Sequence, residues 1–175
     1  MERSLILHMF TPGRQMSPFD INMAVDAGFQ VVVPYCGVTA AEVRGLTQDA
    51  IFSRGPKGVK ATAIFIGGRD VLLAADMLDI ARQAMVPPFE VSVLADPSGS
   101  YTTAAALVAC VEQQLQRAHG SDLSGKRVLI LGGTGTVGRI AGVLAERQGA
   151  TVSLSSHHGA EAAGKAAQDT NRRFD

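Results

Sequence analysis

The sequence predicts an α/β protein with two consecutive domains. Residues 1–120 alternate about four times between a β-branched apolar segment and an amphipathic one, which is typical of parallel strands joined by helices. Residues 127–155 hold an apolar run, a glycine-rich turn, a helical pattern and a second strand pattern. We therefore predict an N-terminal parallel α/β sandwich (1–120) followed by the first part of a Rossmann-type dinucleotide-binding domain (121–175).

Short apolar segments rich in valine and isoleucine predict the strands of the first domain. They span residues 5–10, 30–35, 61–66 and 91–95. Ser17, Pro18 and Asp20 occupy the N-cap, N1 and N3 positions of a helix that should end near Gly28. Asp20 thus has two interpretations that stay open: a capping residue, or part of a substrate cleft.

Further helices are predicted between these strands. Thr39 and Glu42 form a capping box before a short helix over 43–46, and residues 51–53 predict a short strand. Residues 53–58 predict a loop with mobile basic side chains. A helix over 74–85 ends at a proline pair. A further helix over 102–118 should bury four apolar side chains: Leu107, Cys110, Val111 and Leu115.

A dense polar turn follows the strand over 91–95. It carries Asp96, Ser98, Ser100, Thr102 and Thr103, which is more hydrogen-bonding groups than one helix cap needs. Ligands of open α/β sheets bind at the carboxyl ends of the strands, so this turn is a candidate ligand site. The alternative is an ordinary capped helix.

The glycine-rich turn carries the candidate cofactor residues. The run over 128–131 predicts a strand buried on both faces, and residues 150–155 predict a second strand. Between them lies a complete G-x-G-x-x-G, formed by Gly133, Thr134, Gly135, Thr136, Val137 and Gly138. In a dinucleotide site these glycines make a tight turn, admit the pyrophosphate and let helix and strand pack closely. The alternative is a tight βα turn in an ordinary α/β domain.

The residues after the second strand bear on the choice of dinucleotide. An acidic residue there would bind the ribose 2′-hydroxyl of NAD, but this chain has Ser155, Ser156, His157 and His158. Two hydroxyls and two imidazoles favour NADP, or the use of both cofactors. The arginine that often binds the 2′-phosphate is absent from this position.

Composition excludes several classes of protein. Of 175 residues, 46% are hydrophobic, and sixteen basic side chains balance sixteen acidic ones. This gives no footprint for nucleic acid or an anionic membrane. No apolar run is long enough for a membrane span or a secretory signal, so we expect a cytoplasmic protein. Two cysteines and four histidines lack ligand spacing, so we expect no metal site.

The predicted nucleotide domain is short. After Lys126 the sequence predicts two strands and a polar helical tail over 160–174, whereas a nucleotide domain has about five or six parallel strands. We therefore expect the chain to be a truncated part of a longer one.

Four stretches in the first domain resemble the bacterial NAD(P)-dependent methylenetetrahydromethanopterin dehydrogenases. These stretches are residues 17–28, 38–56, 62–68 and 89–106, and residues 123–126 with the glycine turn also fit. The resemblance implies two α/β domains and oxidation of methylenetetrahydromethanopterin to the methenyl form by hydride transfer to NAD(P). The context it implies is one-carbon metabolism, in the formaldehyde oxidation of methylotrophs. It also implies a homo-oligomer, with a trimer as one arrangement.

On this resemblance we assign hypothetical roles to the polar residues. Asp96 or Asp20 would stabilise the developing cation, and Ser98, Ser100, Thr102 and Thr103 would position the pterin. Two alternatives remain: a methylenetetrahydrofolate dehydrogenase, and a non-catalytic nucleotide-binding module. A short-chain reductase is disfavoured because neither Tyr35 nor Tyr101 has a lysine four residues later.

Overall fold

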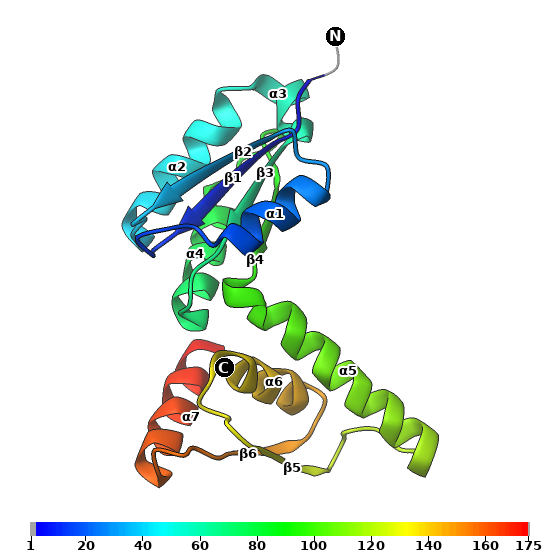
Figure 1. Cartoon of the computed structure of the whole chain (residues 1–175). Helices are drawn as coiled ribbons and strands as arrows, with labels where there is room; N and C mark the ends of the chain where they lie inside the picture. The colour runs from blue at the N-terminus through cyan, green and yellow to red at the C-terminus, as the bar shows by residue number, and fades with distance from the viewer. Residues whose placement is uncertain (1–2, 175) are drawn as a thin grey trace. The chain divides into compact units, whose positions relative to one another are not determined.

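A computed structural model describes residues 3–174, and the chain divides into two compact units between Ser98 and Gly99 (Figure 1). The boundary between the units precedes the helix α5 (Ser100–His119), whereas the sequence analysis put a boundary after it. The physical reason is that α5 packs along helix α6 (Thr136–Arg147) of its own unit.

The first unit is a four-stranded parallel sheet with helices on both faces, which confirms the predicted fold class. Its strands are β1 (Ile6–Thr11), β2 (Val31–Cys36), β3 (Thr62–Ile66) and β4 (Ser92–Ala95), in the order β2-β1-β3-β4. Its helices are α1 (Pro18–Asp26), α2 (Ala40–Phe52), α3 (Gly55–Gly58) and α4 (Val71–Ala84), with short 3-10 turns at Val59–Ala61 and Pro97–Gly99.

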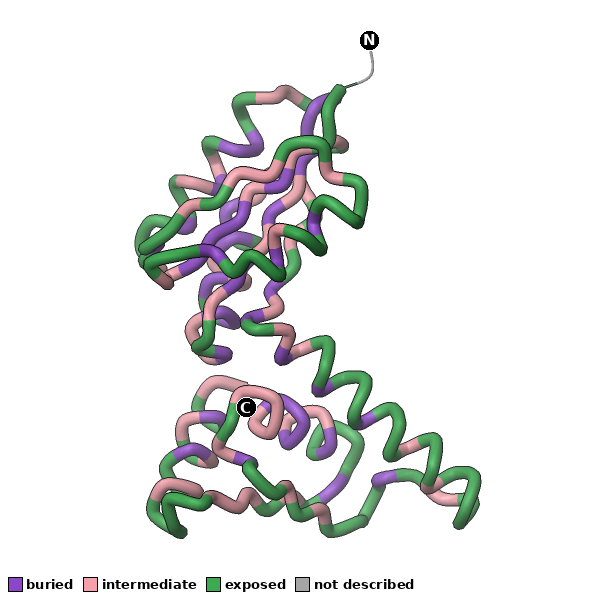
Figure 2. Tube along the Cα trace, viewed as in Figure 1, coloured by how far each residue is buried: buried purple, intermediate pink, exposed green. Residues whose placement is uncertain are grey.

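The side-chain alternation of β1 and β3 divides the core into two layers. Leu7 and Met9 of β1 pack with Ala24 of α1 on one face. The alternate residues, such as Phe10, face the side that α2 and α4 cover together (Figure 1). Buried residues accordingly follow the sheet and the inner faces of the helices (Figure 2).

Two local predictions in the first unit are wrong. Residues 51 and 52 belong to helix α2, because Val43, Thr47 and Ile51 recur at helical spacing and are fully buried. Residues 53–58 are not a mobile basic loop. They include α3, and the Arg54 guanidinium donates hydrogen bonds to the carbonyl oxygens of Ser4 and Ala61 at 3.1 and 2.9 Å.

The second unit contains one βαβ unit between two further helices. Strands β5 (Arg127–Ile130) and β6 (Thr151–Leu154) pair in parallel and are connected by α6, and helix α7 (Ala160–Phe174) follows β6. This is the arrangement that the glycine-rich segment predicts. Among the described residues, 3–174, no helix is long and apolar enough to span a membrane.

Burial in the second unit differs from the sequence prediction in two places. A Cβ on Gly142 of α6 would lie 3.6 Å from Ile130, so α6 covers the face of β5 that bears Ile130. Leu129 and Leu131 alternate onto the opposite face and are 63% and 79% exposed, so this run is not buried on both faces.

The predicted buried stripe of α5 is also wrong. Leu107, Cys110 and Val111 are exposed, and Leu115 is only partly buried. The buried apolar positions are Ala104 and Val108, whose smaller side chains let α5 and α6 approach closely.

Candidate functional site

The strand order of the first unit defines where a ligand can bind. Helix α1 leaves β1 over one face of the sheet, and α4 leaves β3 over the other. The two connections diverge beyond the carboxyl ends of β1 and β3, which leaves the crevice in which ligands of such sheets bind. Asp20, Asp96 and Ser98 are placed around this point by α1 and by the end of β4.

Asp20 is an interior residue and does not cap its helix. Ser17 is the N-cap of α1 but makes no side-chain cap hydrogen bond, so the predicted capping pair is absent. Asp20 is only 9% exposed. Among residues 3–174 its carboxylate forms no hydrogen bond and no ion pair.

The backbone at the end of β3 makes room for this carboxylate. A Cβ added to Gly67 would lie 3.3 Å from Asp20 Oδ2, 3.3 Å from Met16 Sδ and 3.1 Å from the Phe65 ring. Asp20 therefore packs against Gly67, just beyond the carboxyl end of β3. This approach depends on a residue 47 positions away (67 − 20), so local sequence does not reveal it.

A second carboxylate lies near Asp20. The Asp96 amide donates to the Ile66 carbonyl at 3.0 Å, which brings Asp96 beside the end of β3. Burial raises the pKa of Asp20 above its usual value, and the negative charge of Asp96 raises it further. The structure thus brings together the two acidic residues that the sequence analysis singled out.

Ser98 completes this group with a strained backbone. It has φ 55° and ψ 31°, a left-handed conformation that is rare for a residue other than glycine. Its hydroxyl donates to the Gly68 carbonyl at 2.9 Å, which ties the turn after β4 to the turn after β3. Strain of this kind is typical of functional sites.

The other predicted hydroxyls lie in the first turn of α5. This helix begins at Ser100, with Gly99 as a left-handed N-cap. Ser100 is fully buried, and its Oγ has no hydrogen-bond partner within the described range, 3–174. The Thr102 hydroxyl donates to the Gly99 carbonyl at 3.4 Å, and Thr103 is exposed. The division of the chain assigns these three residues to the second unit.

The three glycines of the motif differ in what an added side chain would meet. A Cβ on Gly133 would lie 2.9 Å from Leu154, and one on Gly138 would lie 2.8 Å from the Gly132 carbonyl oxygen. Packing within the protein therefore demands glycine at both positions. A Cβ on Gly135 would meet only the Gly132 carbonyl oxygen, at 3.3 Å, and Gly135 is exposed. The open side of Gly135 is where a ligand can approach the backbone.

The N-terminus of α6 provides donors for that ligand. Gly135 is the N-cap, so the amides of Thr136, Val137 and Gly138 lack carbonyl partners within the helix. A pyrophosphate fits such a helix start, where the positive end of the helix dipole adds to the amides. The turn and helix therefore fit a dinucleotide on their own geometry.

The end of β6 lies against this turn. The Gly133 amide donates to the Ser155 carbonyl at 2.9 Å, and Thr134 Oγ1 and Ser156 Oγ are 3.5 Å apart. His157 and His158 are exposed, with ring centroids 3.7 Å apart. No acidic residue lies between Leu154 and Ala160 to bind a ribose 2′-hydroxyl.

Sequence analysis missed one side chain of this site. Arg139 follows the last glycine of the turn, and its Nε donates to the Thr134 carbonyl at 3.1 Å. The sequence search looked for an arginine after β6, whereas this one comes from the first turn of α6. The signal that could have found it is its place one residue after the motif.

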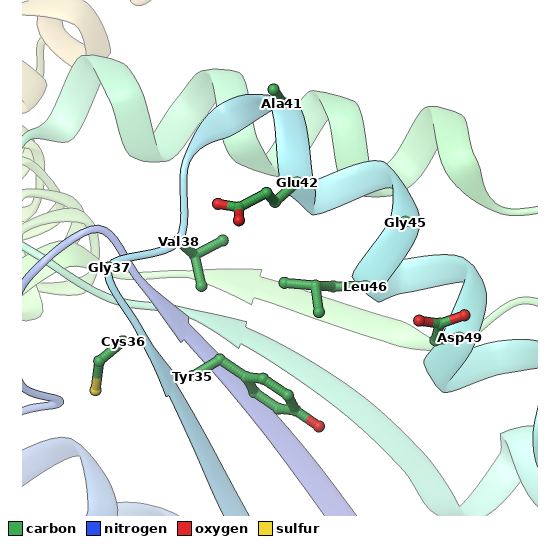
Figure 3. A pocket seen from close by; sticks show the side chains of 9 residues that line it. All are labelled: Tyr35, Cys36, Gly37, Val38, Ala41, Glu42, Gly45, Leu46 and Asp49. Atoms are coloured by element: carbon green, nitrogen blue, oxygen red, sulfur yellow. The ribbon is translucent and has the colours of Figure 1, made fainter.

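A separate groove lies between β2 and α2 (Figure 3). It encloses about 560 Å³ and is lined by Tyr35, Cys36, Gly37, Val38, Ala41, Glu42, Gly45, Leu46 and Asp49. Two of its polar side chains are already paired. The Tyr35 hydroxyl lies 3.1 Å from His8 Nδ1, and Glu42 accepts hydrogen bonds from the amide and hydroxyl of Thr39. These pairings make it a weaker candidate than the crevice between β1 and β3.

Comparisons with known proteins bear on the identity of these sites. Residues 18–98 match the family model for the N-terminal domain of methylene-tetrahydromethanopterin dehydrogenase. Over 174 residues the chain is 51% identical to the NAD(P)-dependent methylenetetrahydromethanopterin dehydrogenase of Methylorubrum extorquens. The predicted resemblance is confirmed. The match covers 99% of this chain and 58% of that relative, so the chain spans only part of the relative's length.

Two further matches are more distant. The bifunctional protein MdtA of Methylorubrum extorquens is 34% identical over 169 residues, which covers 97% of this chain and 57% of that protein. The NAD⁺-bound structure of 3-phosphoglycerate dehydrogenase from Entamoeba histolytica covers 90% of this chain and 56% of its own. Its sequence identity is 14% and its TM-score is 0.29, so no argument rests on that likeness.

Proposed function

We propose that this protein takes part in the oxidation of methylenetetrahydromethanopterin to methenyltetrahydromethanopterin, with hydride transfer to NADP or NAD. The observation that carries this proposal is the 51% identity to a relative named for that reaction, which extends over both units. The proposed context is one-carbon metabolism, in the oxidation of formaldehyde. The homo-oligomer expected from the resemblance stays a prediction.

The proposed chemistry needs orientation and charge stabilisation more than proton transfer. The methylene carbon lies between two nitrogens, whose lone pairs stabilise the cation left when a hydride departs. When bound, the nicotinamide accepts that hydride. The protein then has to hold the two reactants in register, exclude water and provide negative charge near the cation.

The first unit has a suitable source of that charge. We assign Asp20 and Asp96 to stabilisation of the cation, because both lie near the ends of β3 and β4 and Asp20 is held without a partner in the interior. Ser98, Ser100, Thr102 and Thr103 are proposed to position the pterin. A preorganised carboxylate that needs no reorganisation lowers the barrier more than one that is free in water.

The second unit is proposed to hold the cofactor. The amides of Thr136, Val137 and Gly138 would bind the pyrophosphate, with Gly133 and Gly135 shaping the approach and Thr134 beside it. Ser155, Ser156 and His157 would surround the adenosine ribose. Their hydroxyl and imidazole groups tolerate a 2′-phosphate, which supports the use of NADP as well as NAD.

Turnover by the purified chain tests the proposed function. Methylenetetrahydromethanopterin and methylenetetrahydrofolate are each offered with NADP or NAD, and reduced cofactor is followed. Turnover of the methanopterin substrate supports the proposal. A faster rate with the folate substrate would mean that the protein is a methylenetetrahydrofolate dehydrogenase. Nucleotide binding without turnover by the whole protein would support a non-catalytic module instead.

Substitution of Asp96 tests the assignment of the carboxylates. We expect Asp96→Asn to lower kcat by about tenfold or more, because loss of one preorganised electrostatic group costs about 10²- to 10³-fold in favourable cases. Asp26→Asn is the control, since Asp26 is an exposed carboxylate at the end of α1. An unchanged rate for Asp96→Asn would show that this carboxylate has no such role.

A further inference from the structure

Arg139 places a guanidinium beside the glycine turn. It is partly buried in the first turn of α6, and the hydrogen bond from its Nε to the Thr134 carbonyl folds the side chain back over the turn. Among residues 3–174 its two Nη nitrogens make no hydrogen bond. They therefore remain available to a ligand at the turn.

The residue whose carbonyl Arg139 binds also contacts the end of β6 through its hydroxyl. Thr134 Oγ1 is 3.5 Å from Ser156 Oγ, so the turn and the end of β6 meet there. The His158 amide donates to Ser156 Oγ at 3.1 Å and fixes that hydroxyl. The adenosine ribose of a dinucleotide lies at the end of this second strand.

The local charge favours an anion at this place. The first acidic residue after β6 is Glu161, which is exposed on α7. Glu146 and Arg139 line the same 280 Å³ cavity from one face of α6, but they form no ion pair in the described part of the chain. The Arg139 charge is thus not neutralised by a partner. A planar guanidinium matches the oxygens of a phosphate better than any other side chain.

We propose that Arg139 selects NADP over NAD by binding the 2′-phosphate, together with the hydroxyls of Thr134 and Ser156. The inference rests on the cofactor part of the proposed function and adds a specificity residue to it. Arg139, at the start of α6, would take the role of the arginine that is absent after β6. The imidazoles of His157 and His158 are not required for the selection.

The test measures nucleotide binding and needs no turnover. Isothermal titration of the whole chain compares adenosine 2′,5′-bisphosphate with 5′-AMP, which differ only in the 2′-phosphate. We expect the wild-type protein to bind the bisphosphate about tenfold or more tightly, since charge-assisted hydrogen bonds are the strong ones. Arg139→Met should abolish that preference while 5′-AMP binds as before. Arg139→Lys keeps the positive charge but loses the planar pair of N–H donors, so it should retain part of the preference.

Two comparisons separate this role from a structural one. Arg147→Met, at the exposed end of the same helix, should leave the preference unchanged. Ser156→Ala should lower the preference for the bisphosphate over 5′-AMP. If Arg139→Met weakens both nucleotides equally, Arg139 only holds the turn and the proposal is wrong. A wild-type protein without preference also overturns it, and a protein that binds neither nucleotide overturns the proposed cofactor use as well.

Discussion

Asp20 illustrates how a single buried carboxylate can lower the stability of the folded state. Its carboxylate is 9% exposed and has no hydrogen-bond partner among the described residues, and burial raises its pKa, followed by the effect of Asp96. The folded state therefore binds a proton more readily than the unfolded state does. Stability should fall as the pH rises from the ordinary range of an aspartic acid through the raised pKa of Asp20.

We therefore expect Asp20→Asn to stabilise the first unit at neutral pH. The gain should disappear in acid, where Asp20 is protonated and neutral in the wild-type protein as well. Urea unfolding of both proteins at about pH 7 and about pH 4 measures it. Asp26→Asn provides the comparison, because Asp26 is exposed. Equal stability of Asp20→Asn and wild type at neutral pH would mean that the charged Asp20 carboxylate does not lower the free energy of unfolding.

Two glycines of the turn should respond differently to alanine. At Gly138 the new Cβ would meet the Gly132 carbonyl oxygen and Gly133 Cα at 2.8 Å, so we expect a loss of about 1–3 kcal/mol from overpacking. At Gly135 the new Cβ would meet only the Gly132 carbonyl oxygen, at 3.3 Å, so the loss of stability should be smaller than at Gly138 while NADP affinity falls about tenfold or more. Thermal unfolding and nucleotide titration of the two variants measure these effects. A larger stability loss at Gly135 than at Gly138 would contradict this account.

At the scale of the element, the strands were predictable because each is a short, mostly apolar run. The segments predicted at 5–10, 30–35 and 91–95 are observed at Ile6–Thr11, Val31–Cys36 and Ser92–Ala95. Ile51 and Phe52 have strand propensity, yet packing of α2 against α4 makes them helical. Propensity is a weak guide wherever tertiary contacts decide.

The errors at the candidate sites have a common cause. Asp20 had two interpretations, a cap or part of a substrate cleft; the cap is absent, and the position of Asp20 depends on the approach of Gly67 from another strand. Arg139 was overlooked because it reaches the turn from the following helix. Sequence identifies the residues that carry chemistry at the ends of strands. It does not show which of them meet, since that depends on contacts between distant segments.

Helix α2 contains a glycine that neither packing nor backbone geometry explains. A Cβ on Gly45 would have no atom within 4 Å, and its φ is not positive. We expect Gly45→Ala to stabilise the protein by about 0.5–1 kcal/mol, because glycine in a helix interior loses more conformational freedom on folding. Urea unfolding measures the gain. A loss of stability would show that the groove beside Gly45 has to remain open for the fold itself.

At the scale of the whole molecule, the position of α5 decides how the chain can be divided. The boundary at 98/99 assigns α5 to the second unit, in which Ala104 and Val108 are buried and α5 packs along α6. A division at 120/121, the boundary expected from the sequence, would separate α5 from α6. It would expose the apolar side of α6 that α5 covers.

We therefore expect residues 99–175 to form a more stable fragment than residues 121–175. Loss of α5 removes the buried apolar side chains of Ala104 and Val108 and the contact surface of α6, which corresponds to a cost of about 2–5 kcal/mol. That cost is a large share of the stability of a small domain. Urea unfolding followed by circular dichroism measures it for the two fragments. Equal stability would mean that α5 only connects two domains, as the boundary expected from the sequence implies. A folded fragment 99–175 and an unfolded fragment 121–175 would mean that α5 is part of the cofactor-binding unit.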